Sequence, residues 1–226
     1  MEYGLFFDVD GVIADTETVN AQASVEVFRT LYGVEVHPAD FRPFIGGGAE
    51  RYMQGVAEKY GVRINVAEAT RRREDFFLRL LQEKGLAPFP GVLDLIRSAR
   101  SAPDFRLAIS TSGTPTKSMP VLKAAGIDLR DFDTVITASD VTRKKPDPEI
   151  YLLTAERLDL PPAHCVVIED APAGIAAARN AGAKVIAVTN STTAEHLADA
   201  DRIVDSLALV NTGMIRRLVK NGGAKE

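Results

Sequence analysis

Residues 3–12 read YGLFFDVDGV and set the architecture expected for the whole chain. The first half is a short, continuous apolar run, which favours a strand buried on both faces, as in a parallel sheet. Two carboxylates and a glycine follow at once. In open α/β sheets, ligands bind beyond the carboxyl ends of the strands. The stretch therefore predicts a strand that delivers Asp8 and Asp10 to a ligand site.

The rest of the chain repeats this pattern. Short apolar runs alternate with helical segments, and they lie at residues 106–110, 134–137, 165–168, 184–188 and 202–204. Alternation of this kind predicts an α/β fold: a doubly wound, mostly parallel, Rossmann-like sheet with right-handed crossovers.

One block, residues 16–87, interrupts the alternation. Its apolar residues recur at helical spacing, as in Ala21, Val25, Phe28 and Tyr32, and the block has no strong strand signal. The pattern predicts an all-helical cap domain inserted after the first strand. The core α/β domain then comprises residues 1–15 and 88–226.

Composition excludes several classes of protein. The formal net charge is −4, and no basic stripe interleaved with aromatic residues is present, which argues against nucleic-acid binding. No apolar run approaches the roughly 18 residues of a membrane span. The N-terminus does not resemble a signal peptide, so a cytoplasmic location is expected. Nothing in the sequence indicates an obligate protein partner.

Polar side chains stand at the ends of several predicted strands and are expected to converge. Beyond Asp8 and Asp10 they are Ser110, Thr111, Glu169 and Asp170, and Lys145 lies in a basic loop that leads into a helix. Clustered carboxylates repel one another, and a bound cation would relieve the repulsion. All-oxygen ligands favour Mg²⁺, which accepts phosphate as a further ligand. Lys145 and the hydroxyl groups at Ser110 and Thr111 complement the remaining phosphate oxygens.

The two aspartates of the first motif need different roles. An aspartate with an ordinary pKa near 3.9 is ionised at neutral pH, so Asp8 can attack phosphorus and form an aspartyl-phosphate. Asp10, two residues on, can protonate the leaving oxygen and later activate water. The three histidines are scattered, and no catalytic set built on histidine is apparent.

Four ordered motifs resemble those of the haloacid dehalogenase-like superfamily. They are DVDGV at 8–12, Ser110 after an apolar strand, Lys145 before Pro146, and VIED at 167–170. The resemblance implies Asp8 as nucleophile and Asp10 as general acid and base. It places Asp8, Asp170 and the Asp10 carbonyl on Mg²⁺, with Glu169 as a closer or second acidic partner, and it places Ser110 and Lys145 on the phosphate.

The inserted helical block resembles the superfamily's cap in its first insertion position, and the segment DAPAGI at 170–175 resembles the branch that holds β-phosphoglucomutase. In this branch the cap reaches the leaving group of the substrate. Asn20, Glu50 and Arg51 are candidate substrate contacts, the last two after a predicted glycine turn at 46–48. A capping carboxylate and a surface arginine explain Glu50 and Arg51 equally well.

Three functions fit these motifs. The favoured one is a Mg²⁺-dependent phosphatase acting on a small phosphorylated metabolite of the sugar or polyol phosphate class. The alternative is a hexose-phosphate mutase, although Asn20 and Ala49 stand where such mutases carry a histidine and an arginine. A dehalogenase would lack Asp10, and a non-catalytic binding protein on the same fold has no need for four intact motifs.

Overall fold

The computed structural model describes residues 1–45 and 48–220, and a six-stranded parallel sheet forms the core of its α/β part. Within these residues the strand order is β3-β2-β1-β4-β5-β6. The strands are β1 (Tyr3–Phe7), β2 (Phe105–Ser110), β3 (Thr134–Ile136), β4 (Cys165–Glu169), β5 (Lys184–Val188) and β6 (Arg202–Val204). The α/β class predicted from the apolar runs is confirmed.

Strand β1 lies at the point where the strand order reverses. It pairs with β2 on one side and β4 on the other, so Gly4 lies beside both Arg106 and Cys165. The pairing with β4 continues past the strand, because the Asp8 amide donates to the Ile168 carbonyl at 3.1 Å. Ligands of doubly wound sheets bind at such a reversal. The topology therefore places Asp8 at the expected position of a ligand site.

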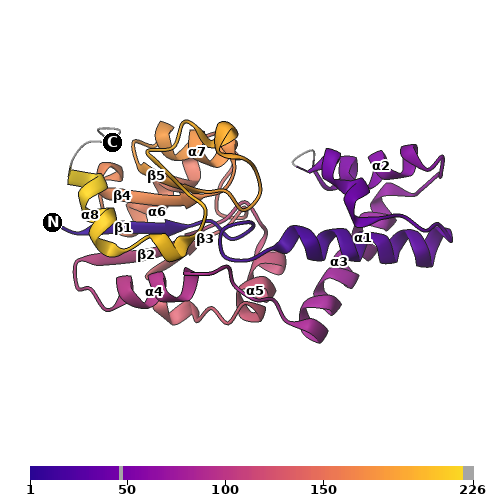
Figure 1. The fold of residues 1–226 in the computed structure, drawn as a ribbon, viewed down its shortest axis with the longest axis horizontal. Helices are drawn as coiled ribbons and strands as arrows, with labels where there is room; N and C mark the ends of the chain where they lie inside the picture. Colours follow the sequence, from indigo (N-terminus) through magenta and orange to yellow (C-terminus); the bar gives the residue numbers. More distant parts are fainter. Residues whose placement is uncertain (46–47, 221–226) are drawn as a thin grey trace. The chain divides into compact units, whose positions relative to one another are not determined.

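Helices cover both faces of the sheet, which explains why its strands are continuously apolar (Figure 1). Helices α6 (Glu149–Arg157) and α7 (Pro172–Asn180) pack on one face with Phe6, Ala108 and Val167. Helix α4 (Val92–Arg100) packs on β2, and it contacts α8 (Thr212–Lys220), which also packs on β4. Helix α5 (Pro115–Ala124) follows β2. All five residues of β1 are buried.

The chain divides into two compact units, Met1–Asp15 with Ala87–Glu226, and Thr16–Leu86. The second unit is helical: α1 (Thr16–Tyr32), α2 (Ala49–Lys59) and α3 (Val66–Lys84) surround an aromatic core that includes Phe28, Phe41 and Tyr52. Two of the glycines in the turn predicted before α2, residues 46 and 47, lie outside the described residues.

Short 3₁₀ helices complete the structure, at Pro38–Phe44, Leu129–Asp131, Pro162–His164, Ala194–Leu197 and Leu207–Leu209. The two segments that enter and leave the helical unit meet within the sheet unit, where Ala14 is bridged to Pro88 and the Phe89 amide donates to the Ile13 carbonyl at 2.8 Å. Among the described residues, no helix combines the length and apolarity needed to cross a membrane.

Candidate active site

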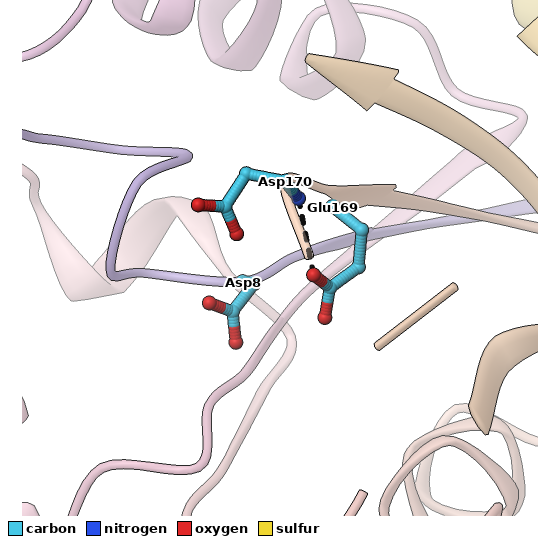
Figure 2. A group of neighbouring side chains, drawn as sticks. All are labelled: Asp8, Glu169 and Asp170. Carbon is cyan, nitrogen blue, oxygen red and sulfur yellow. Dashed lines mark hydrogen bonds between the residues drawn. The ribbon is translucent and has the colours of Figure 1, made fainter. Parts of the chain in front are cut away.

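Three buried carboxylates lie together at the carboxyl ends of the two central strands. Asp8 follows β1, Glu169 is the last residue of β4, and Asp170 comes next; ligand oxygens of all three lie within 4.8 Å of one another. Figure 2 shows the carboxylates of Asp8 and Asp170 directed to the same side, whereas the Glu169 side chain turns the other way. Consecutive residues at a strand end point to opposite sides, so the side chains of Glu169 and Asp170 lie in different surroundings.

Lys145 brings a positive charge into this cluster. Its Nζ lies 2.8 Å from Asp8 Oδ1, 2.6 Å from Glu169 Oε1 and 3.5 Å from the Ser110 carbonyl oxygen. It also lies 4.9 Å from the centre of the Tyr151 ring, where the π face attracts a cation. The side chain is only 8% exposed. Lys145 is therefore a fixed charge next to the Asp8 carboxylate.

Glu169 is saturated with hydrogen bonds. Its Oε1 accepts from Lys145 and from the Tyr151 hydroxyl at 2.7 Å, and its Oε2 accepts from the amides of Asp170 and Ala171 at 3.1 and 3.3 Å. A carboxylate offers about four lone pairs, and these four donors use them all. In this arrangement Glu169 anchors Lys145, and Asp8 and Asp170 are better placed to bind a cation.

Two glycines let the backbone approach the carboxylates. Gly11 has a φ of 76°, in the left-handed region, and a Cβ there would lie 1.8 Å from Asp170 Oδ2. Its carbonyl accepts from Asn190 Nδ2 at 2.8 Å, which ties the loop after β1 to the end of β5. In α7, a Cβ on Gly174 would lie 1.8 Å from Glu169 Oε1. Both positions exclude a side chain because a carboxylate already occupies the space.

We expect Gly174→Ala to lower both stability and activity. Alanine normally stabilises a helix interior by roughly 0.5–1 kcal/mol over glycine. Helix propensity alone would therefore make the Gly174→Ala protein more stable. A loss of stability would instead be due to the clash with Glu169. The matched control is Gly213→Ala in α8, where the new Cβ would lie 3.1 Å from the end of the Asn211 side chain. Thermal unfolding of both variants checks the prediction, and a Gly174→Ala protein as stable as the control would contradict it.

Burial changes the acid–base behaviour of the cluster. Burial raises the pKa of Asp8 to about 8; Lys145 opposes this, and the charges of Glu169 and Asp170 add to it. Burial and the Glu169 charge raise the pKa of Asp170 to about 7. Burial alone would lower the pKa of Lys145, but Asp8 and Glu169 outweigh it, so the ammonium stays charged. The ordinary pKa assumed for Asp8 from the sequence is thus corrected, because the carboxylate is removed from water.

The residues fit a hard divalent cation. One ammonium faces three buried carboxylates, so the fully ionised cluster keeps an excess of negative charge. The donors of Asp8 and Asp170 are oxygens, the ligands that Mg²⁺ prefers. A cation bound there would replace the protons that the raised pKa values otherwise hold on these two aspartates.

We expect Mg²⁺ to stabilise the protein more at about pH 8 than at about pH 6. The folded pKa values of Asp8 and Asp170 exceed the ordinary value of 3.8, so without metal the free energy of unfolding falls as pH rises from about 4 to 8. Mg²⁺ bound to the ionised pair would remove this penalty; at about 100 times its Kd it would add about 2.7 kcal/mol. Thermal unfolding with Mg²⁺ or with chelator at both pH values is the measurement. A larger Mg²⁺ effect at the lower pH would contradict the expectation.

Asp10 lies in the loop after β1 and contacts a residue that sequence reasoning missed. Lys117 Nζ, from α5, lies 3.1 Å from each oxygen of the Asp10 carboxylate. Both side chains are about one third exposed. Asp10 is thus more exposed than the buried group of three carboxylates and does not belong to it.

Ser110 and Thr111 differ in where their hydroxyls are directed. Ser110 is fully buried, and its Oγ lies 2.8 Å from Thr154 Oγ1. Because Thr154 donates its own proton to the Ile150 carbonyl, Ser110 must donate to Thr154. This corrects the expectation that the Ser110 hydroxyl would face a phosphate. Thr111 Oγ1 accepts from the Gly113 amide at 3.1 Å, which leaves its proton for another acceptor.

The candidate cap residues lie within the helical unit. Asn20 is half-buried in α1, and its carbonyl accepts from the Ser24 hydroxyl. Glu50 is exposed in the first turn of α2, where a carboxylate is favoured. Arg51 Nη1 lies 2.8 Å from Glu58 Oε2, and its guanidinium lies over the Phe44 ring. Substrate contact by any of the three stays a prediction.

The structure adds several residues to the site that the sequence did not single out: Lys117, Tyr151, Thr154, Asn190 and Ser191. Asn190 and Ser191 follow β5, so the strand-end argument used for the other residues would have found them. Tyr151 and Thr154 are interior positions of α6 and look like ordinary core residues in the sequence. The sequence feature that points to Lys117 is of another kind: it is a cation in the first turn of a helix, where the helix dipole disfavours positive charge.

Residues 5–188 match the family model described as haloacid dehalogenase-like hydrolase, which covers well over half of the chain. The chain belongs to this family. Among curated members, CbbY from Cereibacter sphaeroides is 36% identical over 217 residues, 90% of this chain and 92% of CbbY. Hexitol phosphatase A from Escherichia coli (strain K12) is 32% identical over 219 residues, 90% of this chain and 91% of that protein.

A longer haloacid dehalogenase-like relative is Protein SUPPRESSOR OF QUENCHING 1, chloroplastic, from Arabidopsis thaliana. It is 36% identical over 201 residues, which are 87% of this chain but 19% of that protein. The chain thus spans about a fifth of the length of this relative.

Solved haloacid dehalogenase-like structures have the same fold. CbbY from Rhodobacter sphaeroides in complex with phosphate superposes with a TM-score of 0.79 at 30% identity, covering 96% of this chain and 100% of that one. Its D10N mutant, in complex with xylulose-(1,5)bisphosphate, gives 0.76 at 30% identity over 92% and 96%. A β-phosphoglucomutase from Clostridium difficile gives 0.77 at 23% identity over 98% and 99%, a likeness of fold. The predicted membership of the haloacid dehalogenase-like superfamily is confirmed, and relatives named as phosphatases are consistent with the expected class, a phosphoric monoester hydrolase.

Proposed function

We propose that the chain is a Mg²⁺-dependent phosphatase that hydrolyses small sugar or polyol phosphates through an aspartyl-phosphate on Asp8. The observation that carries the proposal is the setting of Asp8: buried at the end of β1, 2.8 Å from the Lys145 ammonium and within 4.8 Å of Asp170. Phosphoryl transfer depends mainly on positioning and on neutralising charge, and this setting supplies both. Relatives named for hexitol phosphatase activity and for a sugar bisphosphate complex support the substrate class.

In the first step, an Asp8 oxygen attacks phosphorus while the bond to the leaving oxygen breaks. Asp10 gives its proton to that oxygen, so the alcohol leaves neutral and Asp10 becomes a carboxylate. Lys145 offsets the negative charge that Asp8 and the phosphoryl oxygens bring together. The Thr111 hydroxyl, whose proton is not used in its contact with Gly113, is a further donor to the phosphate.

In the second step, water attacks the aspartyl-phosphate. Asp10 takes a proton from the water, the bond between phosphorus and Asp8 breaks, and Asp8 is regenerated with inorganic phosphate. Mg²⁺ held by Asp8 and Asp170, with the Asp10 carbonyl that the family resemblance adds, would neutralise the carboxylates and bind a phosphate oxygen. Asp8 needs this neutralisation, since burial otherwise keeps its pKa near 8.

The test is phosphate release from a panel of esters with Mg²⁺ and with excess chelator. The panel contains sorbitol 6-phosphate, xylulose 5-phosphate, xylulose 1,5-bisphosphate, glucose 6-phosphate and glycerol 1-phosphate. We expect release from one or more esters that stops when chelator is added. The proposal is wrong if the protein with Mg²⁺ releases phosphate from none of them.

A mutase is the alternative, favoured by the likeness of fold to β-phosphoglucomutase. A mutase holds a second phosphate in its cap, and here the Arg51 guanidinium is already engaged by Glu58 and Phe44. Conversion of β-glucose 1-phosphate to the 6-phosphate, in the presence of its bisphosphate and without net release, would identify a mutase. The cytoplasmic location stays a prediction.

A further inference from the structure

Lys117 contacts the second aspartate of the first motif. Its Nζ lies 3.1 Å from both Asp10 Oδ1 and Asp10 Oδ2, a symmetric contact that brings together residues 107 positions apart in the chain. The general acid of a phosphatase must point its carboxyl group at the leaving group, and a partner that contacts both oxygens restricts the direction in which this group points.

The position of Lys117 opposes the preference of its own helix. It is the third residue of α5, and the first turn of this helix contains no acidic residue. The positive end of the helix dipole disfavours a cation there and favours an anion. When a residue contradicts a local preference of this kind, an interaction elsewhere in the structure compensates for it. The Asp10 carboxylate is a compensating group for this charge.

Backbone structure alone leaves the Asp10 side chain less constrained than that of Asp8. Asp8 continues the ladder of β1, with its amide bonded to Ile168. Asp10 lies in the following turn, next to Gly11 with its φ of 76°. A side chain that leaves a turn needs a side-chain partner to point in a fixed direction, and α5 supplies one.

We propose that Lys117 is a positioning residue for Asp10, holding the carboxyl group in line for proton transfer. The proposal rests on the proposed phosphatase function. In the first step the Asp10 proton moves to the leaving oxygen as its bond to phosphorus breaks, and Lys117 faces the carboxylate that results. In the second step the same contact holds Asp10 as it accepts a proton from water.

The experiment compares two phosphate esters that need the acid to different degrees. p-Nitrophenolate leaves without protonation, whereas an alkoxide does not, so p-nitrophenyl phosphate is compared with the alkyl phosphate hydrolysed fastest in the panel. For Lys117→Ala we expect kcat to fall about 10- to 100-fold with the alkyl ester, but less than about 3-fold with p-nitrophenyl phosphate, with KM unchanged. Lys117→Arg should recover most of the loss.

Two further variants sharpen the result. Lys123→Ala removes an exposed lysine from the last turn of the same helix and should match the wild type. Asp10→Asn with Lys117→Ala should be no slower than Asp10→Asn alone, because Lys117 acts through Asp10.

Each contrary outcome has a separate meaning. Two outcomes would overturn the positioning role and make Lys117 a substrate-binding residue. One is an equal fall in kcat with both esters. The other is an effect on KM alone that becomes larger when the substrate carries a second anionic group. A wild-type protein that hydrolyses no alkyl ester would instead contradict the proposed function. Circular dichroism of every variant separates these outcomes from loss of folding.

Discussion

Asp8→Asn is expected to abolish turnover while the protein stays folded. The amide nitrogen and oxygen of asparagine cannot form the aspartyl-phosphate, and removal of a nucleophile of this kind costs at least about 10⁴-fold in kcat. The substitution keeps the size of the side chain and removes one of three buried negative charges. Phosphate release under single- and multiple-turnover conditions, with thermal unfolding of the same samples, checks the prediction.

The Asp8→Asn substitution should also change how the stability of the metal-free protein depends on pH. Without metal, the wild type loses stability as pH rises from about 4 to 8, because Asp8 and Asp170 must ionise in a buried site. The substituted asparagine cannot ionise, so the metal-free variant should lose less stability than the wild type between about pH 6 and pH 8. Substantial residual turnover in a purified, folded Asp8→Asn protein would rule out Asp8 as the nucleophile.

Lys145→Met is expected to damage both stability and activity. Methionine preserves much of the volume but leaves three buried carboxylates without their cation, and breaking a buried pair in this way costs about 3–5 kcal/mol. For a chain of this size that corresponds to a fall in Tm of about 10 °C. The loss should be larger at about pH 8 than at about pH 6, because protonation of Asp8 and Asp170 relieves the repulsion at the lower pH.

Mg²⁺ provides the control for this second variant. A cation bound by Asp8 and Asp170 should restore part of the lost stability at pH 8 without restoring turnover, because it cannot replace the donor that Lys145 presents to a phosphate. Thermal unfolding and phosphate release measured on the same preparation test both halves. A variant with unchanged Tm at both pH values would show that Lys145 does not compensate the cluster.

The sheet and the main cluster were predictable because strand ends are readable in a sequence. Strands buried on both faces are continuously apolar, and a polar residue directly after such a strand must lie at the carboxyl end of the sheet. This argument located Asp8, Glu169 and Asp170, and Lys145 came from its place before Pro146. Lys117 lies seven residues beyond the end of β2, inside a helix, where no strand-end argument reaches it.

Two properties of the site arise only from tertiary structure. The raised pKa of Asp8 reflects burial by segments that are distant in sequence, and no local pattern encodes burial of that kind. The direction of Ser110 follows from strand alternation, since Ser110 and Ala108 share a face and Ala108 packs on the side of α6. That inference requires knowing which face α6 covers, which depends on the path of the chain between β3 and β4.

The central place of β1 in the sheet also bears on how the protein is made. β1 is synthesised first, yet its partners lie far along the chain, since Gly4 pairs with Arg106 and Cys165. At roughly 5–20 residues per second, β1 waits on the order of 10–30 s for β4 to leave the ribosome. The helical unit, whose contacts are local, can fold in that interval. A nascent chain therefore carries Asp8 for this interval before the sheet that buries the residue exists.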